Sequence, residues 1–234
     1  MNTITYDGTS STTFGMRVGL VNIENAPAKN IESIAVPGRN GALTIDKGNF
    51  ENIEISYTCV ILNNFATNIA AARAYYLSKT GYRRLEDSAN TGEYRMARYV
   101  SGLEVTPSQM RQQGAFTLVF DCMPQRFLTS GETESSFTTS GTITNPTRFD
   151  AKPMLRVYGT GTVGIGSETI TVSTNPGYID IDCDMMDAYY GAVNCNSYIT
   201  MSSGNFTVLE PGDNGVTLGT GITQVKITPR WWTI

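Results

Sequence analysis

Apolar and polar residues alternate along much of this chain, which is the two-residue period of a β-strand with one buried face. The segments NFENIEISYTCVI and GAFTLVFDC show this alternation most clearly. They predict inward-facing side chains at Ile53, Ile55, Tyr57, Cys59, Ile61, Phe116, Leu118, Phe120 and Cys122. We therefore expect both segments to be half-buried strands.

Between these two segments the period changes to that of a helix. The apolar residues at helical spacing are Phe65, Ile69, Ala72 and Tyr76. They predict one helix over about 65–78, with Asn63 or Asn64 as its N-cap and Gly81 beyond its end. One helix is thus expected to pack against one sheet.

The segment VPGRNGAL, residues 36–43, holds two turn signals around one cation. Pro37-Gly38 suits a type II turn and Asn40-Gly41 suits a type I′ turn, which leaves Arg39 at the apex. A phosphate-binding glycine loop needs a helix N-terminus directly behind it. The residues after Gly41 alternate like a short strand instead, so we interpret the segment as a corner between strands.

The segment GYRRLEDSANTGEYRMARYVSGLEV predicts a pair of strands around a turn at residues 89–92. It carries four arginines, Arg83, Arg84, Arg95 and Arg98. We expect them to form a basic patch that serves as a polar face or a subunit contact. A nucleic-acid site is disfavoured because the whole chain has a net charge of −4.

The second half contains short alternating segments at the spacing of a β-sandwich: PMLRVYG, SETITVS, GYIDIDCD, YITMSS, FTVLE and QVKITPRWW. Their expected inward side chains are Leu155, Val157, Ile170, Val172, Ile179, Ile181, Cys183, Val225 and Ile227. These segments predict a two-sheet antiparallel sandwich.

A polar stretch separates the two halves. In TSGETESSFTTSGT eleven of fourteen residues are Ser, Thr or Gly, a composition of linkers and also of threonine-rich edge strands. We expect an N-terminal β domain over residues 1–130, a junction over 131–148 and a C-terminal domain over 149–234.

Composition excludes several kinds of function. The chain of 234 residues has no histidine, so no Ser-His-Asp or Cys-His arrangement and no HExxH zinc site is present. Its segments include no apolar run long enough to cross a bilayer and no secretion signal at the N-terminus, so we expect no membrane partner and synthesis in the cytoplasm. The four cysteines lack a CxxC pair and are expected as buried free thiols rather than metal ligands.

Two constellations remain as candidate chemistry. Asp180, Asp182 and Asp184 share one face of a strand, with Asp187 close behind. We interpret them as a solvated sheet face, with calcium binding and a glycosidase carboxylate pair as alternatives.

The adjacent Trp231 and Trp232 could stack on a sugar ring. Because neighbouring strand residues point to opposite faces, we expect one in the core and one at the rim.

Several of these segments together resemble the distal tail proteins of long-tailed, non-contractile bacteriophages. VPGRNGALT, FENIEISYTCVI, TGYRRLED and FDCMPQRF resemble the N-terminal domain of that family. KPMLRVYGTGT, TITVS, YIDIDCDMMDAYYG, LEPGDNGVTL and VKITPRWW resemble its C-terminal domain in order and spacing.

The resemblance implies a mainly β protein: a sandwich-like N-terminal domain with one helix and an extended β-hairpin, then a galectin-like β-sandwich. It implies a non-enzymatic hub of the virion's distal tail, with no cofactor and no metal. Six copies would form a ring that joins the tail tube to a tail-associated tip or lytic protein and to the receptor-binding apparatus, and DNA would pass through it.

In this interpretation Arg39, Arg83, Arg84, Arg95 and Arg98 are candidate contacts to neighbouring subunits or partners. The alternative function is a carbohydrate-binding adhesion module, motivated by the sandwich and the tryptophans.

Overall fold

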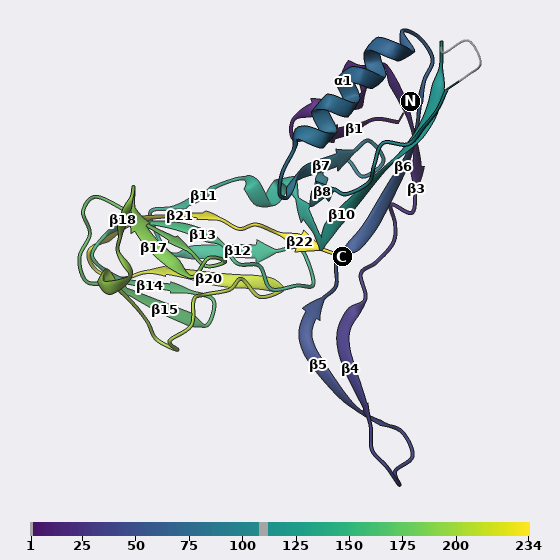
Figure 1. Cartoon of the computed structure of the whole chain (residues 1–234). Coiled ribbons are helices and arrows are strands. Elements are labelled where there is room, and N and C mark those ends of the chain that lie inside the picture. Colours follow the sequence, from purple (N-terminus) through teal and green to yellow (C-terminus); the bar gives the residue numbers. More distant parts are fainter. Residues whose placement is uncertain (1, 108–111) are drawn as a thin grey trace. The chain divides into compact units, whose positions relative to one another are not determined.

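The computed structural model describes residues 2–107 and 112–234 of the chain. It divides into two compact units, a first unit that ends at Arg126 and also includes Ile234, and a second unit, Phe127–Thr233. Strands dominate both units, and Figure 1 shows α1 in the first of them. The expected mainly β class with one α-helix is confirmed for the described residues.

The first unit is built on one antiparallel sheet with the strand order β2-β1-β7-β8-β10-β6-β3, and β9 also pairs with β10. Its strands are β1 (Ile4–Tyr6), β2 (Thr9–Ser10), β3 (Met16–Val21), β6 (Ile53–Ile61), β7 (Arg83–Asp87), β8 (Glu93–Tyr99), β9 (Val105–Pro107) and β10 (Gly114–Leu128), with the short helix η1 (Ser11–Phe14). The second layer is the helix α1 (Phe65–Ser78) rather than a second sheet.

The alternation correctly located the two central strands. β6 and β10 pair antiparallel, from Gly114 opposite Ile61 to Cys122 opposite Ile53. All nine side chains predicted to point inward from these strands are buried. The β7–β8 pair around residues 89–92 is also confirmed.

The helix has the predicted bounds, and its four predicted apolar residues are buried. Asn64 is the N-cap residue, as one of the two predicted alternatives, but it makes no side-chain capping hydrogen bond. Asn64 has φ 51, and the Asn68 side chain donates to the Asn63 carbonyl. Packing of the apolar face therefore holds the helix in place.

The centre of this core is aromatic, and it contains one polar defect. Tyr76 lies 5.9 Å from Tyr6 and 6.1 Å from Phe120 between ring centroids. The hydroxyl of Tyr76 is buried and has no hydrogen-bond partner. A buried unsatisfied hydroxyl costs about 1–3 kcal/mol, so the core tolerates a loss of stability at this point.

We therefore expect Tyr76→Phe to raise the free energy of unfolding by about 1 kcal/mol, because it removes the unpaired hydroxyl and keeps the ring. Urea denaturation would measure the change. The matched control is Tyr75→Phe, which removes a 2.5 Å hydrogen bond to the Tyr6 carbonyl and should lower stability. A destabilised Tyr76→Phe would show that the hydroxyl is satisfied in solution.

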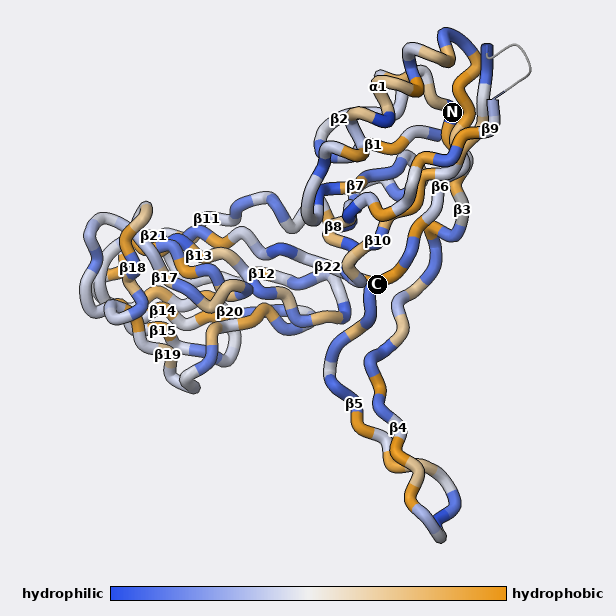
Figure 2. Tube along the Cα trace, in the orientation of Figure 1, coloured by the Kyte–Doolittle hydropathy of each residue, from blue (hydrophilic) through white to orange (hydrophobic). Residues whose placement is uncertain are grey.

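A separate two-stranded sheet of the first unit consists of β4 (Lys29–Ala35) and β5 (Ala42–Phe50), which we call the arm. Every residue from 31 to 49 is exposed. Figure 1 shows the arm as a two-stranded ribbon, and Figure 2 shows hydrophobic stretches along both of its strands. The segment 36–41 is therefore the end loop of a hairpin.

One of the two turns predicted in this loop is correct. Gly38 has φ 79 and the Arg39 N–H donates to the Val36 carbonyl, as a type II turn requires. The type I′ turn at Asn40-Gly41 is wrong, because such a turn needs positive φ at both residues and only Gly41 has it. The six-residue loop removes the need for a tight two-residue turn.

The second unit is the predicted two-sheet antiparallel sandwich. One sheet has the order β11-β21-β13-β16-β17-β18 and the other β12-β20-β14-β15-β19. The strands of these sheets are β11 (Ser135–Phe137), β12 (Gly141–Asn145), β13 (Met154–Gly159), β14 (Gly161–Ile165), β15 (Glu168–Val172), β16 (Ile179–Asp182), β17 (Asp187–Tyr190), β18 (Val193–Asn194), β19 (Ile199–Met201), β20 (Gly212–Leu218) and β21 (Ile222–Thr228), with the short helices η2 (Thr129–Glu132) and η3 (Asn196–Tyr198). The short strand β22 (Trp232–Thr233) belongs to neither sheet.

All nine side chains predicted to face the core of the sandwich are buried. The segment FTVLE is not a strand, and its Leu209 forms only an isolated bridge with Ala151. Residues 131–148 contain β11 and β12, each at the edge of a sheet of the second unit. These threonine-rich residues therefore form edge strands and not a linker.

All four cysteines are buried free thiols, as predicted. Burial raises the pKa of the Cys59, Cys122 and Cys183 thiols to about 12. Among the described residues, no helix is both long and apolar enough to span a membrane.

Candidate functional site

Most of the large apolar side chains of the arm share one face, and Ile31, 46% exposed, lies on the other. Ile34 pairs with Leu43, and Ile45 lies two residues further along β5, so the three side chains share a side of the ribbon. They are 41%, 46% and 44% exposed. Val36, just beyond β4, is 38% exposed. We call Ile34, Val36, Leu43 and Ile45 the apolar face of the arm.

One charged pair lies on the apolar side of the ribbon and one on the opposite side, and both contribute little to the arm's stability. Lys47 lies 3.6 Å from Glu32, and Lys29 lies 3.7 Å from Asp46. About half of each of these side chains is exposed, and exposed ion pairs contribute less than about 1 kcal/mol.

An isolated two-stranded hairpin is only marginally stable in water, and a third strand or another packed element is normally needed. Here the large apolar side chains remain on the surface of the described chain. An exposed apolar face of this kind is typical of a surface that another protein chain covers, so the arm is a candidate docking element.

The four arginines of β7 and β8 do not form one basic patch. Arg83 pairs with Ala97 and Arg84 pairs with Met96, so Arg84 and Arg98 lie on one face of the sheet and Arg83 and Arg95 on the other. Arg98 donates to Asp121 at 2.7 Å and Arg84 to Glu86 at 2.6 Å. Arg39, Arg83 and Arg98 are exposed.

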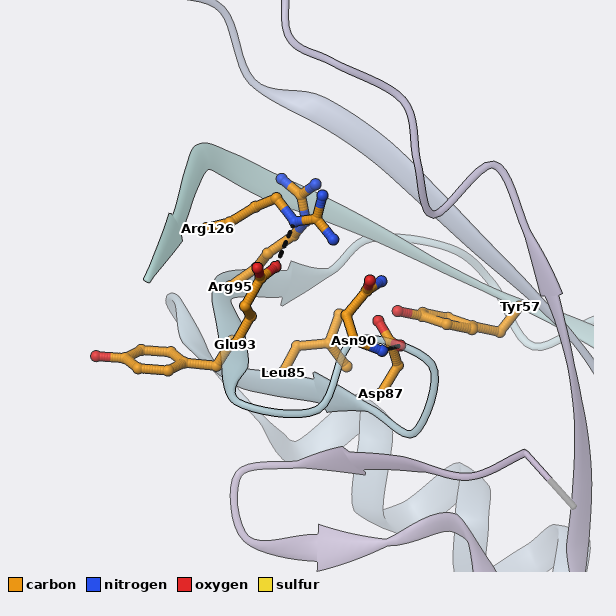
Figure 3. Close-up of a pocket in the computed structure, with 8 residues that line it drawn as sticks. Tyr57, Leu85, Asp87, Asn90, Glu93, Arg95 and Arg126 are labelled. Atoms are coloured by element: carbon orange, nitrogen blue, oxygen red, sulfur yellow. Dashed lines mark hydrogen bonds and ion pairs between the residues drawn. The ribbon is translucent and has the colours of Figure 1, made fainter. Parts of the chain in front are cut away.

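Arg95 is only 8% exposed and lines a small polar pocket of the first unit. Figure 3 shows its guanidinium beside that of Arg126, which lies 2.9 Å from Glu93. Burial, together with the charge of Arg126, lowers the pKa of Arg95, and its Nη2 atom has no hydrogen-bond partner. The pocket, with a volume of about 10 Å³, has room for about one water molecule.

The aspartate cluster of the second unit is not a solvated sheet face. Asp180 and Asp182 are 5% and 4% exposed. Arg156 binds Asp180 with two hydrogen bonds of 2.6 and 2.8 Å, and Arg230 binds Asp182 with two of 2.7 and 2.8 Å. The prediction failed because both arginines come from distant segments and cover this face of β16.

These pairs also remove the support for the chemical alternatives. The charges of the Asp180 and Asp182 carboxylates are already balanced by ion pairs with arginines. Asp184 lies in the turn after β16. In the part of the chain that the structure describes, no group of His, Cys, Asp or Glu is arranged to hold a metal ion.

Another buried carboxylate of the sandwich is Glu168, which is 8% exposed. Burial would raise its pKa, but hydrogen bonds from the Ser202 hydroxyl at 2.6 Å and the Ser203 N–H at 3.0 Å outweigh burial and lower the pKa to about 2. The ionised form therefore stabilises the fold above the usual pKa of 4.5, and this contribution is lost as the pH falls toward 2.

We expect Glu168→Gln to be less stable than the natural chain at pH 7, by about 1 kcal/mol for the lost charge on two hydrogen bonds. The difference should shrink as the pH falls from 4.5 toward 2. Thermal unfolding at a series of pH values measures it. A difference in stability between the two proteins that stays constant over this pH range would contradict the lowered pKa of Glu168.

The two tryptophans divide as predicted into core and rim. Trp231 is 5% exposed. The ring of Trp232 stacks on Phe149 at 4.4 Å, and its Nε1 donates to the Asp150 carbonyl at 2.9 Å. One face and the polar edge of Trp232 are thus already used within the second unit.

No protein-family model and no curated protein matches this sequence. Among solved structures, the chain is similar to SPP1 Dit (gp19.1), with a TM-score of 0.77, 13% identity and coverage of 100% of both chains. The chain has the Dit fold. SPP1 Dit is described as a paradigm of the hub adsorption apparatus in phages that infect Gram-positive bacteria. A chain of the phage p2 baseplate, in its activated conformation with Sr, is similar over 97% of this chain and 98% of that chain, with 12% identity and a TM-score of 0.47.

The apolar face of the arm is the feature of this Dit fold that analysis of single motifs missed. Part of its signal is present in the sequence, because Leu43 and Ile45 alternate with the polar Thr44 and Asp46 after the loop, whereas Ile34 and Val36 before it are separated by Ala35. This pattern predicts an amphipathic strand after the loop. It does not reveal that no third strand covers the hairpin.

Proposed function

We propose that this chain is a structural hub protein of a phage tail tip. The similarity in fold to SPP1 Dit over the full length of both chains supports this role. In the proposal six copies close into a ring, which joins the tail tube to a tail-associated tip or lytic protein and to the receptor-binding apparatus. DNA passes through the ring without specific binding, in keeping with the net charge of −4 on each copy.

The observation that carries self-assembly is the exposed apolar face of the arm. In a closed ring each copy presents this face to its neighbour, so the apolar face of every copy is covered in the same way. A ring also protects exposed strand edges, and β2 and β3 are the terminal strands of the first unit's order. Arg39 at the tip of the arm, with Arg83 and Arg98, remains a proposed contact to neighbours.

The proposal is tested by the size and symmetry of the purified protein. Sedimentation velocity should give the mass of six chains, and negative-stain micrographs should show six-fold rings, either for the chain alone or after addition of the tail tube protein. A chain that stays monomeric at high concentration, with and without the tube and tip proteins, would contradict it.

The carbohydrate-binding alternative rested on the sandwich and the tryptophans; the sandwich is present, but one face of Trp232 is stacked on Phe149 and Trp231 is buried. We therefore propose a non-enzymatic, structural role in the virion, with no cofactor.

A further inference from the structure

The arm leaves the sheet of the first unit at Asn22 and returns to it at Asn52. Between these roots the arm strands pair with each other as a separate sheet, and residues 31–49 are exposed. Contacts made along the arm therefore cannot fix its direction. At about 3.3 Å per residue, the seven residues of β4 span about 23 Å. A rotation of about 10° at the roots would displace the tip by roughly 4 Å on that length.

Asn22 begins the outgoing root, which is also held by Ile23, packed against the core, and by Glu24, 3.7 Å from Arg126. The β3–β6 ladder ends with Val21 opposite Ser56, and the next residue, Asn22, adopts a left-handed backbone with φ 48. Its side chain then takes the place of a backbone pair, since Nδ2 donates to the Glu54 carbonyl at 3.1 Å and Oδ1 accepts from the Ser56 N–H at 2.9 Å. Asparagine suits this position because it tolerates the left-handed region and carries both a donor and an acceptor.

Asn52 holds the returning root, one residue before β6. Its Nδ2 lies 2.6 Å from the Tyr82 hydroxyl and 3.1 Å from both carboxylate oxygens of Asp121. Arg98 binds the same carboxylate at 2.7 Å and so keeps it in place. In addition, the Glu51 N–H donates to the Ala28 carbonyl at 2.9 Å and ties the two roots together.

We propose that Asn22 and Asn52 are positioning residues that hold the arm in the direction needed to reach a second copy of this chain. The restraint of the arm follows from the contacts above, and its consequence for assembly rests on the proposed function. Preorganisation of this kind strengthens association by removing the entropy cost of ordering the arm in the complex.

The test measures the direction of the arm and assembly separately. Spin labels on Arg39→Cys at the tip and Thr117→Cys on the sheet report their distance distribution, and the four natural thiols are buried. The labelled chain is diluted into excess unlabelled chain or measured as a monomer. The variants are Asn22→Asp, which tolerates the left-handed backbone without adding backbone freedom and loses the Nδ2 donor to the Glu54 carbonyl, and Asn52→Ala. Asn49→Ala, an exposed asparagine of β5, is the control.

We expect both root variants to unfold near the natural temperature, to broaden the distance distribution, and to weaken self-association about tenfold each, the scale of one hydrogen bond. Asn49→Ala should change neither distance nor association. If both root variants show a spin-label distance distribution as narrow as that of the natural chain, the inference is overturned, whether or not the variants assemble. The natural chain could fail to associate while the distance distributions of the root variants still broaden. That result would support the restraint of the arm and contradict the proposed ring.

Discussion

Leu43→Asp should leave the chain folded and unable to form rings. Leu43 is 46% exposed and contributes nothing to the buried core of the first unit, so its loss should change stability by less than about 0.5 kcal/mol. In the assembly the same side chain lies at the centre of the apolar face. Burial of one leucine is worth about 1.5–3 kcal/mol, and a carboxylate there must be desolvated without a partner.

Each contact in the ring should therefore weaken by at least about 100-fold, which corresponds to roughly 2.7 kcal/mol. Sedimentation velocity at several concentrations measures the loss. The matched control is Thr44→Asp, which places the same charge on the next residue of β5 and thus on the opposite side of the ribbon. Rings that persist in Leu43→Asp, or that vanish equally in both variants, would show that the apolar face is not the contact.

The second large effect is expected inside the sandwich. Asp182→Asn should destabilise the second unit by about 3 kcal/mol, because it leaves the half-buried guanidinium of Arg230 without its counter-charge. The hydrogen bonds from Arg230 hold the pKa of Asp182 below its ordinary value. The pair therefore stabilises the fold above the usual pKa of an aspartate, and this contribution disappears as the pH falls through the lowered value.

The control for this prediction is Arg230→Gly. Arg230 has φ 58, a left-handed conformation that costs an arginine about 1–2 kcal/mol and costs glycine little. The Asp182 carboxylate also keeps hydrogen bonds from the N–H groups of Asp184 and Met185. We expect Arg230→Gly to be less harmful than Asp182→Asn in urea denaturation. The reverse order would mean that the arginine contributes mainly through its own packing.

The sequence predicted those parts of the fold that depend on neighbours along the chain. The helix from Phe65 to Ser78 was found because its apolar residues recur within four positions of one another. The inward faces of β6 and β10 were found because alternation is a local property. The strands β14 and β20 were missed as separate elements, since their glycines and threonines weaken the alternation.

Features that depend on distant residues could not be predicted. The aspartates of β16 looked solvated because Arg156 and Arg230, which cover them, are 24 and 48 residues away from their partners. The apolar face of the arm was missed for a different reason. The sequence predicted a strand for Leu43 and Ile45 but not for Ile34, and the covering element is absent from the described chain.

The second unit begins and ends at one place. The N–H of Leu128, at its start, donates to the Trp231 carbonyl near its end at 2.9 Å, and the N–H of Arg230 donates to the Gly131 carbonyl at 2.8 Å. A domain whose first and last segments are joined by backbone hydrogen bonds can be exchanged as one piece. We therefore expect that another module with similarly close ends could replace the second unit while the residues up to Arg126 keep their fold.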